Sequence, residues 1–185
     1  MTGIDLMISE HDLIERMLKV MRQASLKLVN SGEINYDDFY AMADFVKVYA
    51  DEHHHAKEEK ILFNRMVEEL GETGRVIITH GMLVEHDLGR LHMAELKNAL
   101  QMHREGTREA VIDVVASAVG YANLLSRHID KENKMVYTYA QRGLCAQTLA
   151  QVDEACEAFE KVQAQKGVQQ HYSELVAALE DKYSQ

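Results

Sequence analysis

The chain has 185 residues, enough for one domain of ordinary size with a short extension and too few for two full domains. Hydrophobic residues make up 46% and charged residues 27%, which is typical of a globular protein and excludes a disordered chain. The formal net charge of −10 leaves little material for a basic groove, so a nucleic-acid partner is not expected.

The longest apolar runs are a handful of residues, far short of the roughly 20 that a membrane span needs, so no membrane partner is expected either. The amino terminus lacks the basic segment and apolar stretch of a secretory signal. Only two cysteines are present, Cys145 and Cys156. Together these features predict a cytoplasmic protein with reduced thiols.

The absence of proline favours long helices joined by short turns. In chain order, apolar residues at helical spacing predict helices over about 4–29, 37–70, 75–102 and 107–141, with Asp37 as the cap of the second. Four helices of this length with short connections are typical of an all-α, up-down-up-down four-helix bundle.

Two shorter amphipathic helices are predicted over about 146–165 and 168–183. We expect them to pack on the outside of the bundle or to mediate association into a homodimer. This predicts a bundle over residues 1–143 and a C-terminal helical extension over 144–185.

The sequence contains an internal repeat. Glu10-His11-Asp12-Leu13 recurs as Glu85-His86-Asp87-Leu88, 75 positions later. The segments 54–63 and 128–137 share His, Lys, Glu and Lys at an offset of 74. Two matches at nearly one offset indicate a duplicated helix pair, with the four helices around an approximate two-fold axis.

The repeat selects candidate metal ligands. Each half brings one inward histidine, His11 or His86, and then a His-x-x-x-Glu pair, His54/Glu58 or His128/Glu132. Residues four apart share a helix face, so each pair can present a nitrogen and an oxygen to one point inside the bundle. His55 and Glu59 have the same spacing but do not align with the repeat, and they stay as flanking candidates together with His53.

A lone inward histidine is more often a hydrogen-bonded core residue than a ligand. Here, however, two buried carboxylates without a counter-charge would cost several kcal/mol each. A nitrogen and carboxylate set without cysteine suits iron or manganese and excludes a structural thiolate zinc centre. The set is sufficient for two metal ions. No phosphate loop or dinucleotide motif is present, so no organic cofactor is expected.

These motifs resemble those of the hemerythrin-like HHE cation-binding domains, with one motif on each helix in the family's order, over about residues 4–141. The resemblance implies a non-haem di-iron centre (Fe²⁺/Fe³⁺, oxo- or hydroxo-bridged) with Glu58 and Glu132 as bridges. His11, His54, His86 and His128 would be the terminal ligands. It also implies a small diatomic or peroxide ligand.

The resemblance leaves three functions open. The first is a protein that binds or senses O₂, NO or peroxide. The second is a di-iron enzyme, namely a peroxidase, a nitric oxide reductase or an iron-centre repair protein, and the third is an iron store or interaction module.

The chain departs from the oxygen carriers of the family, whose third helix supplies two histidines four apart. The positions four residues from His86 hold Met82 and Arg90, so one ligand is missing. Glu15, four residues after His11, is a candidate for that place or for an ion pair with Arg90.

The carboxylates next to the motif histidines, Glu10 and Glu85, lie about 100° around the helix from them, which better suits hydrogen bonding to imidazole than ligation. Glu85 is kept as a further candidate ligand.

One position of the repeat differs in size. Ile14 corresponds to Gly89, so a side chain is missing about one turn from His86. The glycine predicts either a void that admits a small ligand or a close approach between helices.

Overall fold

A computed structural model describes residues 1–184, and these residues form helices and no strand. The first long helix is α1 (Gly3–Ser31). The second long helix contains two π-helical segments and comprises, in order, α2 (Tyr36–Phe45), η1 (Val46–His55), η2 (Glu58–Leu62) and α3 (Phe63–Glu69). The third comprises α4 (Gly71–Ile77), η3 (Ile78–Met82) and α5 (Leu83–Arg104). The fourth comprises α6 (Ala110–Lys131), η4 (Glu132–Val136) and α7 (Tyr137–Gly143).

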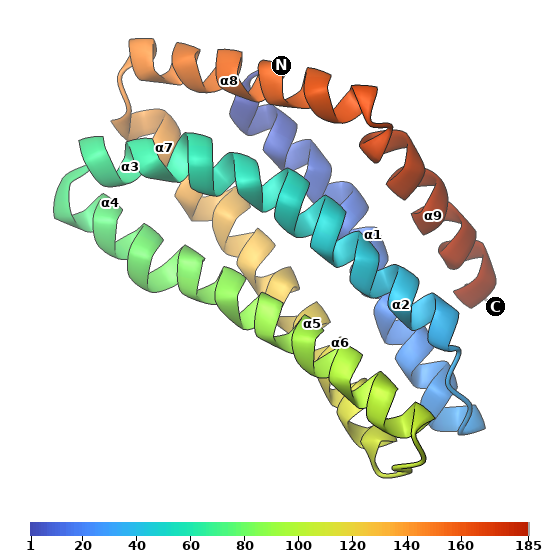
Figure 1. The fold of residues 1–185 in the computed structure, drawn as a ribbon. Coiled ribbons are helices and arrows are strands. Elements are labelled where there is room, and N and C mark those ends of the chain that lie inside the picture. The colour runs from blue at the N-terminus through green and yellow to red at the C-terminus, as the bar shows by residue number, and fades with distance from the viewer. Residues whose placement is uncertain (185) are drawn as a thin grey trace.

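The long helices run up and down along one another and confirm the expected four-helix bundle (Figure 1). Two boundaries differ from the predictions. The second helix is capped by Asn35, whose side chain accepts a hydrogen bond from the Asp38 backbone N–H, whereas Asp37 lies in the first turn, where its charge favours the helix dipole. The third helix begins at Gly71, four residues before the expected start at 75. Gly71 has a positive φ of 64°, which glycine adopts without strain, and this one residue reverses the direction of the chain.

The hydrophobic core has two parts, separated by a buried polar layer. On α1, Ile4 and Met7 belong to one apolar cluster and Ile14 to the other, with His11 between them. The fourth helix runs in the opposite direction and shows the reverse order, with Glu132 between Ile129 of the cluster that contains Ile14 and Val136 of the cluster that contains Ile4. The core therefore encloses the candidate ligands and excludes water from them.

The C-terminal extension consists of α8 (Ala146–Gln165) and α9 (Val168–Tyr183), which lie along α1 (Figure 1). Val152 and Cys156 of α8 join one apolar cluster, and Tyr172 and Val176 of α9 join the other. The extension thus packs on the outside of the bundle, as one of the two expectations had it. Association into a homodimer through these helices stays a prediction.

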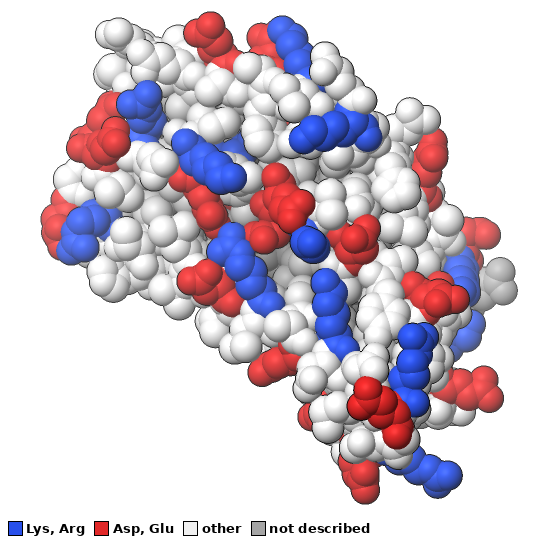
Figure 2. Space-filling view, viewed as in Figure 1, with Lys and Arg blue, Asp and Glu red and all other residues white. Residues whose placement is uncertain are grey.

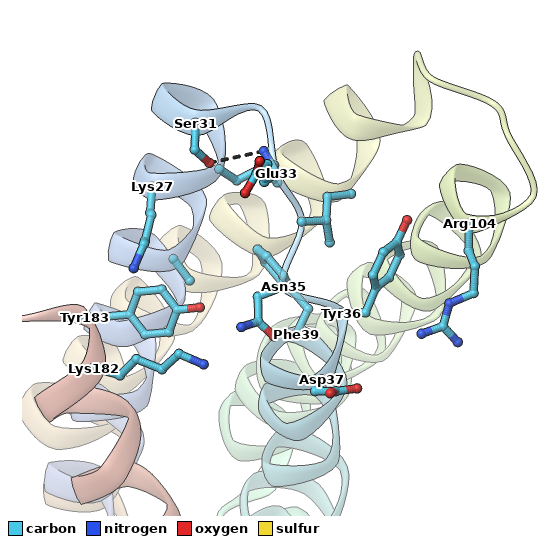
Figure 3. Close-up of a pocket in the computed structure, with 13 residues that line it drawn as sticks. Lys27, Ser31, Glu33, Asn35, Tyr36, Asp37, Phe39, Arg104, Lys182 and Tyr183 are labelled. Carbon is cyan, nitrogen blue, oxygen red and sulfur yellow. Dashed lines mark hydrogen bonds between the residues drawn. The ribbon is translucent and has the colours of Figure 1, made fainter.

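The carboxyl end of α9 is held beside the loop between α1 and α2, where a cavity of about 490 Å³ opens (Figure 3). The Tyr183 hydroxyl donates a hydrogen bond to Asp38 Oδ2 over 2.5 Å, and Lys182 Nζ lies 2.6 Å from the same oxygen. The lining of this cavity contains none of the candidate ligands, so it is separate from the polar layer.

The surface carries mixed charge. On the face drawn in Figure 2, acidic and basic side chains alternate and form no continuous basic patch. None of the helices within residues 1–184 is both long and apolar enough to cross a membrane.

Candidate metal centre

The polar layer brings together all six residues that the repeat selected: His11, His54, Glu58, His86, His128 and Glu132. Each is at most 2% exposed. They form two adjoining groups, each with ligand atoms within 4.8 Å of one another, and both groups include Glu58.

The first group contains His11 and His54, whose Nε2 atoms face each other at 2.9 Å. Glu132 Oε2 lies 3.4 Å from His11 Nε2, and Glu58 Oε2 lies 3.7 Å from His54 Nε2. Two nitrogens and two carboxylates, contributed by three of the long helices, therefore converge on one point.

The second group repeats this arrangement with His86 and His128, whose Nε2 atoms are 3.1 Å apart. Glu132 Oε1 lies 2.9 Å from His128 Nε2, and Glu58 Oε2 lies 3.5 Å from His86 Nε2. Glu58 belongs to both groups through Oε2, and Glu132, a member of the first group, also places Oε1 2.9 Å from His128, so both carboxylates lie between the two pairs of histidines.

Each of these four imidazoles is also held at its other nitrogen, Nδ1, by an oxygen from a neighbouring helix. Glu10 bonds His54 at 2.7 Å and Glu85 bonds His128 at 2.8 Å. The other two contacts are Glu59 with His86 at 2.7 Å and Asn133 with His11 at 2.9 Å. The three carboxylates and the Asn133 amide oxygen accept, so each Nδ1 atom carries a proton, and an imidazole that is neutral then presents a lone pair at Nε2.

This arrangement fits bound cations. Two Nε2 atoms that face each other at about 3 Å repel through their lone pairs unless a positive charge lies close to both, either a metal ion or the proton of an imidazolium such as His128. In addition, Glu58 Oε2 and both oxygens of Glu132 are buried without a hydrogen-bond partner among the described residues. Burial and the neighbouring Glu132 carboxylate raise the pKa of Glu58 well above its usual value, and a metal ion would relieve this cost.

His55 is placed where it could supply the donor that the sequence count lacked. It joins Glu58, His86 and His128 in the second group, and its ring stacks on that of His86 at 3.9 Å. Sequence reasoning named it only as a flanking candidate because its repeat partner is Ile129. The run of three histidines at 53–55 was the available signal.

The expected ion pair between Glu15 and Arg90 is not found among the described residues, and a metal role for Glu15 stays a prediction. Glu15 belongs to none of the metal-type groups found among residues 1–184. Arg90 pairs instead with Asp51 and Glu59, because α5 borders the second helix at this level. Glu59 and Glu85 face the Nδ1 side of the imidazoles, so they hold histidines and do not reach the centre of the layer.

Two of the π-helical segments begin at the bridging candidates. η2 starts at Glu58 and η4 at Glu132, both five residues long and 74 positions apart, so the duplication is visible in the backbone. π-helical turns within α-helices are often found at functional sites, and the wider turn changes which residues face the core. The longer segment η1 ends with three histidines, and all three are buried.

A buried ion cluster, which the sequence did not predict, seals one side of the layer. The Lys57 ammonium, fully buried, donates hydrogen bonds to Glu10 and to Glu160 of α8. His53 lies beside it, with Nε2 3.1 Å from Glu10 Oε1. Glu10, His53 and Glu160 have metal-type spacing, but the ammonium lies among them, so we interpret this cluster as an ion-pair network.

The equivalent lysine of the repeat, Lys131, bonds Glu85 but is 41% exposed, because the extension covers only the first half. The coincidence of Lys57 and Lys131 in the repeat was a signal for both pairs. Nothing in the sequence indicated the contribution of Glu160.

The family model described as Hemerythrin HHE cation binding domain matches residues 2–140. The chain belongs to this family. The hemerythrin match includes every residue of both four-membered groups and ends before α8 begins. Comparison of the chain with curated proteins finds no match, and comparison with solved structures finds none either. A hemerythrin HHE domain binds cations, and the paired His/Glu groups of this chain are suited to that role.

Proposed function

We propose that the protein holds two iron ions in the polar layer and binds or senses O₂, NO or peroxide there. The first ion would be held by His11 and His54, and the second by His55, His86 and His128. Glu58 and Glu132 would bridge the two. The observation that carries this proposal is the pair of facing Nε2 contacts, 2.9 and 3.1 Å, flanked by carboxylate oxygens without hydrogen-bond partners.

The donor set supports iron over a structural zinc ion. It contains only imidazole and carboxylate, and the cysteines lie outside both groups. Bound iron would supply an exchangeable position and a change of oxidation state. The chain's own residues hold the imidazole protons at Nδ1, keep water out through the two apolar clusters, and make the two positions unequal, with two histidines against three.

The test is the visible absorption of the iron-loaded, oxidised protein before and after addition of azide. We expect a new absorption band that saturates with azide and disappears on its removal. A matched variant, Glu52→Ala on the exposed surface of η1, should behave like the wild type. An iron-loaded protein whose spectrum does not respond to azide would contradict an exchangeable ligand position.

A di-iron oxidoreductase that consumes peroxide or NO is the second candidate, and one contact favours it. The Tyr137 hydroxyl donates a hydrogen bond to Glu58 Oε1 over 2.5 Å, and its ring stacks on His11. This places an oxidisable phenol directly against a bridging candidate. Sustained turnover of peroxide or NO with a reductant would favour the enzyme, whereas stoichiometric reversible binding would favour the sensor or carrier. Neither result is expected of an interaction module.

We also propose that residues 1–143 are the metal-binding unit and that 144–185 are an extension that closes one side of it. The Lys57–Glu160 contact supports this division of roles. A cytoplasmic location is likewise proposed, supported by two free thiols, which are typical of reducing compartments.

A further inference from the structure

A cavity of about 270 Å³ lies beside the second metal position, between the second helix and α5. Its inner wall includes the rings of His55 and His86. At roughly 30 Å³ per water molecule, this volume exceeds what a diatomic ligand needs, yet it is below the size of most drug-binding pockets. The cavity therefore suits a small organic molecule.

The cavity lies at a position where the two halves of the duplicated bundle differ. It borders Gly89, whereas the equivalent Ile14 is buried and fills its half. A Cβ atom at Gly89 would lie 3.3 Å from Cε2 of Tyr121, so the glycine also allows this ring to approach α5. Gly89 therefore borders a cavity on one side and a closely packed ring on the other.

Two residues of the lining carry a buried polar atom without a hydrogen-bond partner among the described residues: His55 at Nδ1 and Tyr121 at its hydroxyl. The Tyr121 hydroxyl is buried and makes no hydrogen bond within the part of the chain that the structure covers. Burial, and then the nearby carboxylate of Asp51, raise the pKa of this phenol, so it stays protonated and can donate or accept. An unpaired buried hydroxyl costs free energy, and a polar group of a ligand would remove that cost.

The rim of the cavity carries cations. Lys47, Arg90 and Lys97 line it, and Figure 2 shows basic side chains over the second helix and α5. Arg90 is neutralised by Asp51, Glu59 and Asp87. Lys97 forms no ion pair with a described residue, so its charge is free to attract an anion. The remaining wall, with Val46, Met93 and Ala94, is apolar.

We propose that this cavity binds a small aromatic carboxylate with a polar group at its far end. The carboxylate would lie at the Lys97 rim, the ring against the apolar wall, and the far polar group at the Tyr121 hydroxyl. This site depends on the fold and not on bound iron, so it goes beyond the metal function proposed above. A molecule bound in this cavity would lie next to His55 and His86.

The experiment is calorimetric titration of the full-length protein, at a measured metal content, with 4-hydroxybenzoate, benzoate and phenol. We expect 4-hydroxybenzoate to bind most tightly, because benzoate lacks the group that meets Tyr121 and phenol lacks the group that meets Lys97. Tyr121→Phe, which keeps the ring, should weaken 4-hydroxybenzoate roughly tenfold and benzoate little.

A surface variant keeps the test independent of folding. Lys97→Met should weaken both carboxylates roughly two- to fivefold and leave phenol unchanged. Its matched control, Lys60→Met, lies outside the cavity on an exposed position and should change nothing. The absence of saturable binding at millimolar 4-hydroxybenzoate, or binding that neither Tyr121→Phe nor Lys97→Met weakens, would overturn the proposal. Metal content is read separately, so a failure here is distinguishable from a failure of the iron site.

Discussion

At the scale of single residues, the polar layer shows how hydrogen bonds prepare side chains for metal ligation. Glu10, Glu85, Glu59 and Asn133 each fix one imidazole by its Nδ1 atom. The free lone pairs at Nε2 then point inward. Such supporting contacts orient the ring and increase its basicity, and their removal costs metal affinity.

Tyr137 allows a test of this support with little change in shape, because the repeat carries Phe63 at the equivalent position. Tyr137→Phe removes the hydrogen bond to Glu58 but keeps a ring that the fold accommodates. We predict unchanged stability and a roughly 10- to 100-fold lower affinity for iron, measured by competition with a chelator. Phe63→Tyr is the matched control in the other half. Equal affinities for Tyr137→Phe and the wild type would show that the hydroxyl does not support the site.

Protonation of the layer gives a second prediction, about proton release on metal binding. Burial lowers the pKa of His128, but the Glu132 and Glu85 carboxylates outweigh burial and raise that pKa to about 9. Glu58 also has a raised pKa, whereas burial, together with His11, lowers the pKa of His54 to about 4. Near neutral pH the metal-free layer therefore carries a proton on His128, and the second nitrogen of His54 carries none.

Because metal ligands must be deprotonated, binding of iron at about pH 7.5 should release about one proton per chain from His128, and more if the raised pKa of Glu58 keeps that carboxyl protonated. Above about pH 9.5 the release should fall by roughly one, since His128 has then already lost its proton. Calorimetry in buffers with different ionisation heats measures this number. Metal binding without proton release at neutral pH would contradict the charge assignment.

At the scale of helices, the duplication places a Glu–Lys pair in each half of the bundle, and the C-terminal extension covers only one of them. α8 places Glu160 over the first Glu–Lys pair and buries it, whereas the second pair stays open to solvent. Removing one partner of a buried ion pair costs far more stability than removing one at the surface, because the remaining charge is left buried without a partner. The two lysines of the repeat should therefore differ in energetic weight.

Lys57→Met leaves the buried Glu10 beside the partly buried Glu160 without the lysine cation, and we predict a loss of about 3–5 kcal/mol in the free energy of unfolding. Lys131→Met, at the matched and partly exposed position, should cost less than about 1 kcal/mol. Urea denaturation of both variants with the same metal content measures the difference. Equal losses would mean that α8 does not change the role of the buried pair.

At the scale of the whole molecule, periodicity and the repeat were enough to predict the bundle, the extension and six residues of the polar layer. Alignment of His54/Glu58 with His128/Glu132 separated them from the neighbouring pair His55/Glu59. The repeat did not indicate His55, because the residue at the equivalent position, Ile129, is not a histidine. Ion pairs between distant segments could not be predicted from the sequence. The partners of Glu160 and Arg90 lie on other helices, so they depend on how the helices pack and not on spacing along the chain.

The proposed centre requires two metal ions that share Glu58 and Glu132. The most direct test is the metal content per chain, by elemental analysis, after loading with ferrous iron and removal of excess. We predict two iron ions per chain for the wild type and for the surface control Glu68→Ala, and fewer than two for Glu58→Ala and Glu132→Ala. One ion or none in the wild type, or two in both bridging variants, would contradict the account.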